Sequence, residues 1–501
     1  MVNGRDDAIA RLKSGKPALL WQRRIADTET PVAAALRLME PDRGDFLLES
    51  VEGGSVRGRH SLLGLAPDLI FRAQGGSAQI NRRWLIDRDA FTACEKPTLA
   101  ALRDLVISCR ADVPDGLPRA LALLVGYFGY ETIGLIEKLA IPASDPLGLP
   151  DILFVRPTVL LVFDRLADAL YLVAPAWPDG DRAAEAIADE AAGRLEATAA
   201  RLATTKLPPA PRADVPEPAL RPQLADGRYG EMVAAAKDYI AAGDIFQVVL
   251  AQRFTAPFPL PPFELYRALR RINPSPFLYH LDLPGFSLTG SSPEILVRAR
   301  DGEITIRPIA GTRPRGRTAA EDEANRASLL ADPKERAEHL MLLDLGRNDT
   351  GRVAQSGSVR VTESYTVEFY SHVMHIVSNV VGTLRNDRDS LDALYAGFPA
   401  GTVSGAPKVR ACQIIAELEP EKRGAYAGAV GYFSPDGSMD SCIVLRTAIV
   451  KDGVMHVQAG AGIVADSDPA NEQRECEAKA GALLAAAREA VRRAGEGDYG
   501  Q

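Results

Sequence analysis

The chain has 501 residues, 46% of them hydrophobic and 25% charged, which is the composition of a globular protein and not of a disordered one. Its formal net charge of −8 excludes a general binder of nucleic acid or of anionic membranes, since both need a basic surface. An anionic substrate therefore requires a local positive site.

The five cysteines form no C-x-x-C pair, and the start of the chain, MVNGRDDAIARL, lacks the apolar core of a signal peptide. No uninterrupted apolar run approaches the length of a membrane span. We therefore expect a cytoplasmic protein, in a reducing compartment, with buried thiols.

The first part of the chain alternates strand-like apolar runs with turns. The runs expected to be strands of a buried sheet are 45–50, 61–64, 121–130 and 152–163. Residues 181–203 are rich in Ala, Glu and Arg, which predicts a helix. Prolines then recur throughout 207–224, so we expect a linker there between an N-terminal region, 1–206, and a C-terminal domain, 225–501.

The second part opens with an amphipathic helix, 229–242, closed by Gly243, and continues with the strand IFQVVLAQRF and the helix PFELYRALRRI. FLYHLDLPG and FSLTGSSPEILVRAR form a predicted strand pair, with Pro284-Gly285 as its turn. Further strands are expected in EITIRPIAGT, AGAVGYFSP, SCIVLRTAIV and VMHVQAGAGIVA, before a long helix from Pro469. Because hairpins outnumber crossovers, the pattern predicts an α+β fold with antiparallel sheets.

The segment DPKERAEHLMLLDLGRND predicts a helix with Asp332 as N-cap, a first-turn proline and Gly346 as its stop. Glu335 and Glu338 share one face of this helix. The late segment NEQRECEAK has the same spacing, with Glu472, Glu475 and Lys479 on one face. Two such carboxylate pairs suit Mg2+, which prefers oxygen ligands; for a single E-x-x-E, a solvated helix face is the commoner interpretation.

The segment FPAGTVSGAPK is not a Walker A loop, because Gly401 and Gly405 have only three residues between them. It predicts a glycine-rich turn into a helix near Pro407, with backbone N–H groups and the Thr402 hydroxyl free for an anion. A purely structural turn is the alternative.

The segment QAGAGIVADSD lacks the third glycine of a dinucleotide fingerprint, so Gly460 and Gly462 are expected to admit a ligand close to the backbone. His375 lies in an alternating strand, where a satisfied core histidine is the commoner interpretation. Arg446, inside the apolar run CIVLRTAIV, needs an anionic partner.

In order along the chain, LLES, NPSP, GSSPE, PIAGT, AEHLMLLDLGRND, FPAGTVSGAPK and the E-x-x-E tail closely resemble the chorismate-utilising enzymes. The resemblance is strongest over 225–490, and within the family it is to the large subunits of anthranilate synthases. It implies the family's two-layer antiparallel β-sandwich flanked by helices. It also implies a carbon–oxygen lyase that converts chorismate and ammonia to anthranilate and pyruvate in tryptophan biosynthesis.

The resemblance further implies roles for individual residues. Glu338 and Glu475 match the Mg2+ ligands, and Glu335 and Glu472 lie beside them and act through metal-bound water. Glu294 matches the general acid for the departing C4 hydroxyl, and we count His375 and Glu335 with it as catalytic. The positions matching the substrate-binding residues are Tyr426 and Arg446 at the enolpyruvyl carboxylate, and Thr402, Gly462 and Lys479 at the ring carboxylate, with Gly460 beside them.

Two departures within the family favour ammonia as the nucleophile. Isochorismate and salicylate synthases carry a lysine base that activates water where this chain has Gln247. Aminodeoxychorismate synthases commonly have P-I-K-G-T, whose lysine attacks the ring, where this chain has Ala310. Three alternatives remain open. Two are enzymes, a para-aminating relative and a relative that releases aminodeoxyisochorismate; the third is a catalytically silent protein that senses tryptophan and docks a glutaminase.

No cysteine lies in a G-x-C-x-G elbow, so ammonia is expected from a separate glutaminase (glutamine amidotransferase) subunit, in a heterotetramer of two copies of each chain. The LLES and NPSPF segments resemble the family's feedback site for L-tryptophan. The residues matching that inhibitor site are Glu49, Ser50, Asn273, Pro276 and Phe277. By itself, LLES is more simply the end of a strand.

Overall fold

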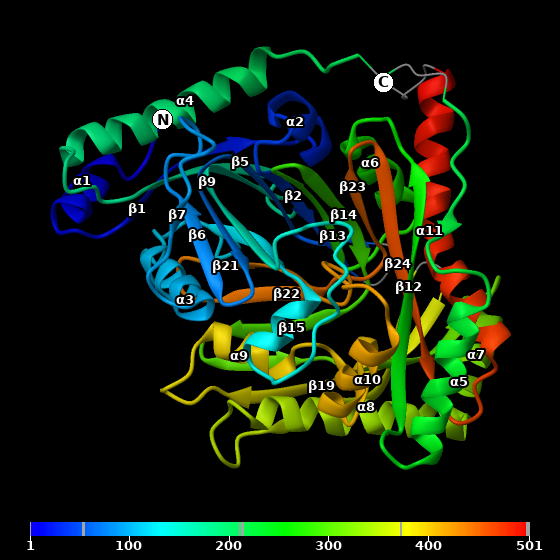
Figure 1. Ribbon diagram of the computed structural model, residues 1–501. Helices are drawn as coiled ribbons and strands as arrows, with labels where there is room; N and C mark the ends of the chain where they lie inside the picture. Colours follow the sequence, from blue (N-terminus) through cyan, green and yellow to red (C-terminus); the bar gives the residue numbers. More distant parts are fainter. Residues whose placement is uncertain (1, 53–55, 210, 212–214, 371–372, 497–501) are drawn as a thin grey trace.

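The computed structural model describes residues 2–52, 56–209, 211, 215–370 and 373–496 (Figure 1). It is a mixed α+β structure in which 22 strands join into one sheet. All of the strand ladders between the described elements are antiparallel, which confirms the predicted fold class.

The N-terminal part supplies the strands on one side of this sheet. Its strands are β1 (Ala18–Ile25), β2 (Asp45–Glu49), β3 (Val51–Glu52), β4 (Val56–Arg57), β5 (His60–Gln74), β6 (Ser77–Asn81), β7 (Thr92–Ala93), β8 (Leu124–Phe128), β9 (Ile152–Asp164) and β10 (Ala169–Ala176). Its helices are α1 (Arg5–Lys13), α2 (Pro31–Leu38), α3 (Thr98–Ser108), the 3-10 turn η1 (Tyr130–Leu135) and α4 (Ala184–Thr204).

The C-terminal part supplies the remaining elements. Its strands are β11 (Arg221–Pro222), β12 (Gln247–Pro257), β13 (Phe277–Leu283), β14 (Phe286–Ser292), β15 (Ile295–Arg300), β16 (Glu303–Ile306), β17 (Ile309–Pro314), β18 (Arg360–Phe369), β19 (Val373–Thr383), β20 (Gly405–Ala406), β21 (Ala429–Phe433), β22 (Met439–Ile443), β23 (Thr447–Lys451) and β24 (Val454–Ile463). Its helices are α5 (Arg228–Ala241), α6 (Pro262–Ile272), α7 (Ala319–Ala331), α8 (Pro333–Gly351), α9 (Ser390–Gly397), η2 (Gly401–Val403), α10 (Lys408–Leu418) and α11 (Pro469–Glu496).

The two parts of the chain share strands and core. β2 pairs with β13, and β8 pairs with β21, so the sheet runs from one part into the other. Between the parts, the proline-rich segment 207–224 contributes the short β11, which pairs with β12.

The sheet folds into two layers with an apolar core between them. Alternate side chains of β9 point to opposite faces, as strand geometry requires. Leu160 and Val162 join Tyr279 and Leu288 in the core between the layers. Leu161 lies on the other face, in a core shared with α1, α2 and α4.

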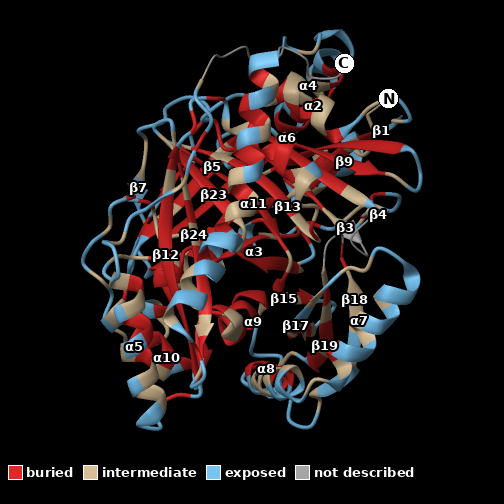
Figure 2. Cartoon of the chain, turned by 90° about the vertical axis from the view of Figure 1, so that its right-hand side faces the viewer, coloured by how far each residue is buried: buried red, intermediate tan, exposed pale blue. Residues whose placement is uncertain are grey.

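Helices cover the outer faces of the layers (Figure 1). α4 packs on β1, β9 and β10, α11 lies along β24, and α8 packs on β17 and β19. Along α11, buried residues such as Cys476, Ala480, Leu483 and Ala487 recur every three to four positions, so one face meets the sheet. Figure 2 shows this alternation of buried and exposed residues on α11, with α8 below β15, β17 and β19.

Three runs predicted as single strands are each interrupted, so those predictions are wrong. FSLTGSSPEILVRAR breaks at Pro293-Glu294, and EITIRPIAGT breaks at Pro308, because proline cannot donate a ladder hydrogen bond. SCIVLRTAIV breaks before β23, where Arg446 adopts a φ of +47°. Two of these breaks therefore place Glu294 and Arg446 at strand ends and not inside strands.

Helix α8 begins as predicted but does not stop at Gly346. The Asp332 carboxylate caps it by accepting from the amides of Lys334 and Glu335. The helix continues to Gly351, and Gly346 is buried inside it, where an added Cβ would lie 3.0 Å from Pro308. The glycine is therefore explained by close packing and not by termination.

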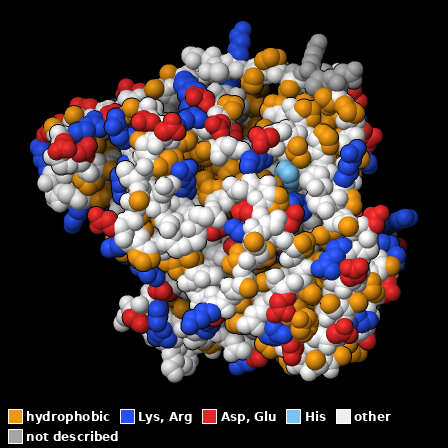
Figure 3. Space-filling view, in the orientation of Figure 1, with side chains coloured by type: hydrophobic (Ala, Val, Ile, Leu, Met, Phe, Trp, Pro, Cys, Tyr) orange, Lys and Arg blue, Asp and Glu red, His pale blue; other side chains and the backbone are white. Residues whose placement is uncertain are grey.

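The surface agrees with the sequence composition. Basic and acidic side chains are interspersed over the face in Figure 3, with no single basic field. Among the helices of the described residues, none combines the length and apolar composition that a membrane span requires.

Candidate active site

The centre of the candidate site is the carboxyl group of Glu294, at the break between β14 and β15. Its backbone carbonyl accepts from the amide of Ile443, which fixes the break against β22. Its Oε1 accepts a hydrogen bond from the Thr402 hydroxyl at 3.0 Å. The Thr402 hydroxyl is therefore not free for an anion, contrary to the expectation from the sequence.

Burial raises the pKa of Glu294 to about 8, against the opposing effects of the Thr402 hydrogen bond and the positive charge of Arg446. At neutral pH this carboxyl group therefore carries its proton. A protonated carboxylic acid in a buried site is the state that a general acid needs.

Arg446 lies between β22 and β23, with its carbonyl oxygen accepting from the amide of Ser291. Its guanidinium makes no hydrogen bond or ion pair with the residues that the structure describes. Burial lowers the pKa of this guanidinium, and the acidic groups Tyr370 and Glu294 beside it oppose that effect. Because a partly buried guanidinium remains charged, it favours a bound carboxylate, which it can hold by two hydrogen bonds.

His375 on β19 lies near Arg446, whose positive charge acts on its imidazole. Its Nδ1 is 2.9 Å from the carbonyl oxygen of Gly311 and 3.1 Å from the Thr312 hydroxyl. Because a carbonyl only accepts, Nδ1 carries the hydrogen and Nε2 presents a lone pair. Burial lowers the pKa of the imidazole, so it is neutral and suited to accept a proton.

Helices α8 and α11 bring the predicted metal ligands toward one another. Burial, followed by the negative charge of Glu335 and then that of Glu475, raises the pKa of Glu338. Glu335 accepts from Arg313 at 2.9 Å, and Glu475 pairs with Lys479 at 2.7 Å. In the described parts of the chain, Glu338 itself has no hydrogen bond or ion pair.

This donor set fits a divalent cation. A half-buried carboxylate without a partner, facing like charges, is stabilised by a hard cation with oxygen ligands. No group of three or more His, Cys, Asp or Glu side chains among the described residues is placed to hold a metal. A cation here would therefore be held by Glu338 and Glu475, with water completing its shell, as Mg2+ permits.

A further part of the candidate site is formed by Lys479, Gly460, Gly462 and Tyr426. The Lys479 ammonium donates to the carbonyl of Gly460 at 2.8 Å. An added Cβ on Gly460 would lie 2.9 Å from the Tyr426 hydroxyl, and one on Gly462 would lie 2.6 Å from the Gln247 amide nitrogen. Glycine is required at both positions because atoms of this protein lie against them, including the Leu250 carbonyl oxygen at 2.9 Å from a Cβ on Gly460. The approach of a ligand to these glycines stays a prediction.

The sequence analysis missed two side chains that shape the site. The Tyr370 ring packs against His375, with 5.4 Å between ring centroids, and Tyr370 is also a neighbour of Arg446. Arg313 holds Glu335 beside Glu338. Nothing in the local pattern distinguishes this tyrosine. For Arg313, its place directly after PIAGT is the only signal.

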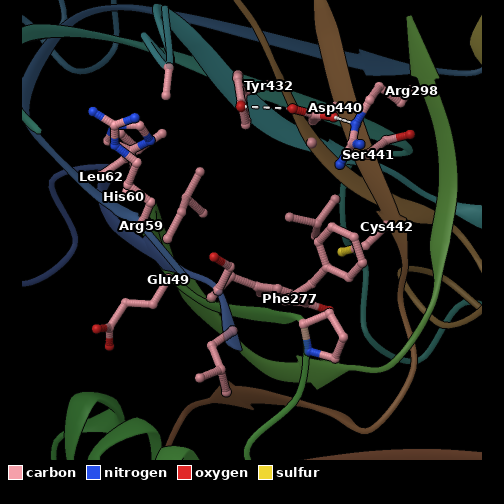
Figure 4. A pocket seen from close by; sticks show the side chains of 18 of the residues that line it. Glu49, Arg59, His60, Leu62, Phe277, Arg298, Tyr432, Asp440, Ser441 and Cys442 are labelled. Carbon is pink, nitrogen blue, oxygen red and sulfur yellow. Dashed lines mark hydrogen bonds and ion pairs between the residues drawn. The ribbon is translucent and has the colours of Figure 1, made fainter. Parts of the chain in front are cut away.

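A separate cavity of about 380 Å3 lies among residues of β2, β13 and β22. We call it the β2–β13 cavity (Figure 4). Of the predicted inhibitor-binding residues, Asn273 lies outside its lining. The others, which line it, are Glu49, Ser50, Pro276 and Phe277.

The Glu49 carboxylate is already bound within the protein. It accepts from Arg270 at 2.9 and 3.1 Å and from the Tyr266 hydroxyl at 2.7 Å, which ties β2 to α6. Figure 4 shows this carboxylate pointing away from Phe277. Its oxygens are therefore not free for a ligand in this structure.

Comparison with known proteins agrees with this geometry. The sequence profile of the chorismate binding enzymes matches residues 47–485. Anthranilate synthase component 1 from Cereibacter sphaeroides is 52% identical over 493 residues, 97% of this chain and 98% of that protein. The same component from Thermus thermophilus is 47% identical over 473 residues, 92% of this chain and 96% of that protein.

Solved structures also resemble this chain in fold. Anthranilate synthase component I from Streptococcus pneumoniae superposes with a TM-score of 0.74 at 37% identity, covering 92% of this chain and 99% of that one. The menaquinone-specific isochorismate synthase from Escherichia coli shares the fold, with a TM-score of 0.70 at 20% identity, covering 97% of this chain and 99% of that one.

Proposed function

The chain belongs to the chorismate binding enzyme family, and we propose that it catalyses the conversion of chorismate to anthranilate and pyruvate, a step of tryptophan biosynthesis. The observation that carries the proposal is the buried Glu294 carboxyl group near Arg446, whose guanidinium has no partner among the described residues. Chorismate brings to such a site two carboxylates and a hydroxyl that must leave.

In the first step, ammonia forms a bond to C2 of the ring, the double bonds shift, and the C4–O bond breaks. Glu294 transfers its proton to the departing hydroxyl, which leaves as water. Arg446 and Tyr426 hold the enolpyruvyl carboxylate, while Thr402 and Lys479 lie toward the ring carboxylate. Glu338 and Glu475 would hold Mg2+, which would supply a positive charge to neutralise and orient the ring carboxylate.

In the second step, the C3–O bond to the enolpyruvyl group breaks as the ring loses its proton at C2 and becomes aromatic, and the departing enolpyruvate takes up a proton at its methylene carbon to give pyruvate. Nε2 of His375 is the group placed to accept the ring proton, because its Nδ1–H is fixed by Gly311. Glu335 lies next to Gly311, the residue that fixes His375: its Oε2 is 3.1 Å from the position that a Cβ on Gly311 would take. Gln247 and Ala310 support amination by ammonia, since neither can activate water or attack the ring.

The ammonia is proposed to come from a glutaminase subunit. The relatives named component 1 support a partner component, and a complex of two copies of each chain is proposed. The compartment proposed is the cytoplasm, in agreement with five cysteines that are reduced, four of them buried.

The β2–β13 cavity is proposed to bind L-tryptophan as a feedback inhibitor. Phe277 and Pro276 offer an apolar wall for an indole, and Ser50 offers a hydroxyl. The internally bound Glu49 supports the cavity by holding β2 to α6, so the proposed contact to Glu49 is indirect.

The test is anthranilate fluorescence from the purified chain with chorismate, Mg2+ and ammonium at mildly alkaline pH, with and without tryptophan. We expect emission that requires Mg2+ and is suppressed by tryptophan. Emission that is insensitive to tryptophan would remove only the inhibitor site. Consumption of chorismate without anthranilate would replace the proposed product, and intact chorismate would contradict the proposal.

A further inference from the structure

Arg423, in the turn after α10, is the largest fully buried side chain in the described structure, with 1% of its surface exposed. Its Nε and Nη2 donate to the two carboxylate oxygens of Glu419 at 2.8 and 2.6 Å. Its guanidinium also faces the rings of Tyr130 and Tyr426, at 4.7 and 5.6 Å from their centroids. A cation at this depth is stable only with such complete pairing.

The remaining donors of Arg423 reach two segments that carry the active site. Nη1 donates at 2.8 Å to the carbonyl of Val403, the residue after Thr402. Nη2 donates at 2.7 Å to the carbonyl of Val249, whose strand position is opposite Gly462. One guanidinium therefore joins the loop of Thr402 to β12, the strand that pairs with Gly460 and Gly462 of β24.

The backbone of Arg423 is fixed as well. Glu131 accepts from the amides of Arg423 and Gly424 at 2.7 and 3.0 Å. The amide of Tyr426 donates to the carbonyl of Arg423, which completes the turn that carries this tyrosine. The position of Tyr426 is thus set through both the backbone and the side chain of Arg423.

We propose that Arg423 is a positioning residue of the active site, which sets the distance between Thr402 and Tyr426 through its bonds to Val403, Val249 and Glu419. Thr402 and Tyr426 lie toward different carboxylates of the substrate, so this distance selects a dicarboxylate of the correct span. The identity of that substrate rests on the proposed function. The placement of the Thr402 loop by Arg423 does not depend on it.

A double variant, Arg423→Met with Glu419→Leu, separates positioning from stability. Replacing both members of a buried ion pair by apolar residues of similar size is often neutral for stability. In this case the Ala251 amide and the carbonyls of Val403 and Val249 also lose a partner, so we expect a folded variant with a thermal midpoint lowered by about 5 to 10 °C. Because the bonds to Val403 and Val249 are lost, we expect kcat/KM for chorismate to fall about 100-fold, mainly through KM.

Amide hydrogen exchange tests the positioning without any substrate. In the double variant, peptides covering 398–407 are expected to exchange about tenfold faster than in the parent. The control is Arg156→Met with Asp68→Leu, another bidentate pair with an aromatic neighbour, Trp177, in which the arginine is buried and the aspartate half-buried. This control should change neither the exchange of 398–407 nor KM.

Unchanged exchange over 398–407 in a folded double variant would overturn the proposal, whatever the activity. If the double variant does not fold, Arg423→Lys replaces it, because a single ammonium keeps the charge but cannot span both carbonyls and Glu419. For Arg423→Lys we expect the same rise in KM, and parental KM and exchange would overturn the proposal. A parent chain inactive on chorismate would contradict the proposed function only, since the exchange result still decides the positioning.

Discussion

The β2–β13 cavity and the active site differ in how their charges are compensated. In the β2–β13 cavity, the charged side chains that line it have partners within the protein. These pairs are Glu49 with Arg270, Arg59 with Asp164, and Asp440 with both Arg298 and Arg300. In the active site, Arg446 and Glu338 have no such partner among the described residues.

This difference indicates what each site expects from its ligand. Where charges are already paired, a ligand gains little from ionic contacts, so apolar fit and shape must provide its affinity. Where a guanidinium and a carboxylate are left without partners, the ligand must bring an anion and a cation of its own. The two sites therefore differ in what a ligand must supply: mainly apolar contact at the β2–β13 cavity, and compensating charge at the active site.

The largest expected effect is on the one buried acid of the active site. Replacing Glu294 by Gln removes the proton donor and should lower kcat by about 100- to 10,000-fold. Steady-state anthranilate formation measures it. A variant within threefold of the parent would contradict the role of Glu294 as general acid.

The pH profile of the parent tests the same residue. The acid form is the active one, and burial raises the pKa of Glu294 to about 8. At a constant concentration of free ammonia, activity should therefore be retained below pH 8 and fall as the pH rises through that value. Thr402→Val removes the hydrogen bond that lowers this pKa, so the fall should move to higher pH.

The next largest effect is expected when the positive charge of Arg446 is removed. Arg446→Gln should raise KM for chorismate by about 30- to 1,000-fold, because the carboxylate it holds is then buried without a partner. The matched control is Arg298→Gln in the β2–β13 cavity, where the cation is paired with Asp440. Equal effects of the two substitutions on KM would break the comparison between the sites.

A smaller effect is expected in the dependence on Mg2+. Glu338→Gln removes one proposed ligand and the like-charge repulsion that a cation relieves, so half-maximal activity should need about 100-fold more Mg2+. Titration of activity with Mg2+ measures this. Glu477→Gln, at an exposed carboxylate of α11 that accepts from Gln473, serves as the control, and an Mg2+ requirement unchanged in Glu338→Gln would remove Glu338 from the metal site.

The smallest effect concerns the β2–β13 cavity. Ser50→Phe fills part of the space of about 380 Å3 and should raise the tryptophan concentration for half-inhibition about tenfold or more. kcat without tryptophan should stay within twofold of the parent. Retained inhibition would show that the inhibitor lies elsewhere.

Much of the architecture follows from local patterns. The helix from Pro333, the final helix from Pro469 and the antiparallel hairpins are confirmed, because caps, periodicity and turn residues act over a few positions. The breaks at Glu294 and Arg446 escaped prediction. Pro293 marks the first break, and the prediction passed over it. At Arg446 the apolar run continues the strand pattern, and only the pairing of β22 and β23 with different strands separates them.

The sequence by itself determined the family, the fold class and the residue types that the chemistry needs, since motifs and periodicity are properties of short segments. Only the tertiary structure decided which charges remain without partners. Pairing of Glu49 with Arg270 on α6, and of Thr402 with Glu294, joins positions more than a hundred residues apart. The physical reason is that burial and ionic pairing depend on what surrounds a side chain in space, which no local pattern specifies.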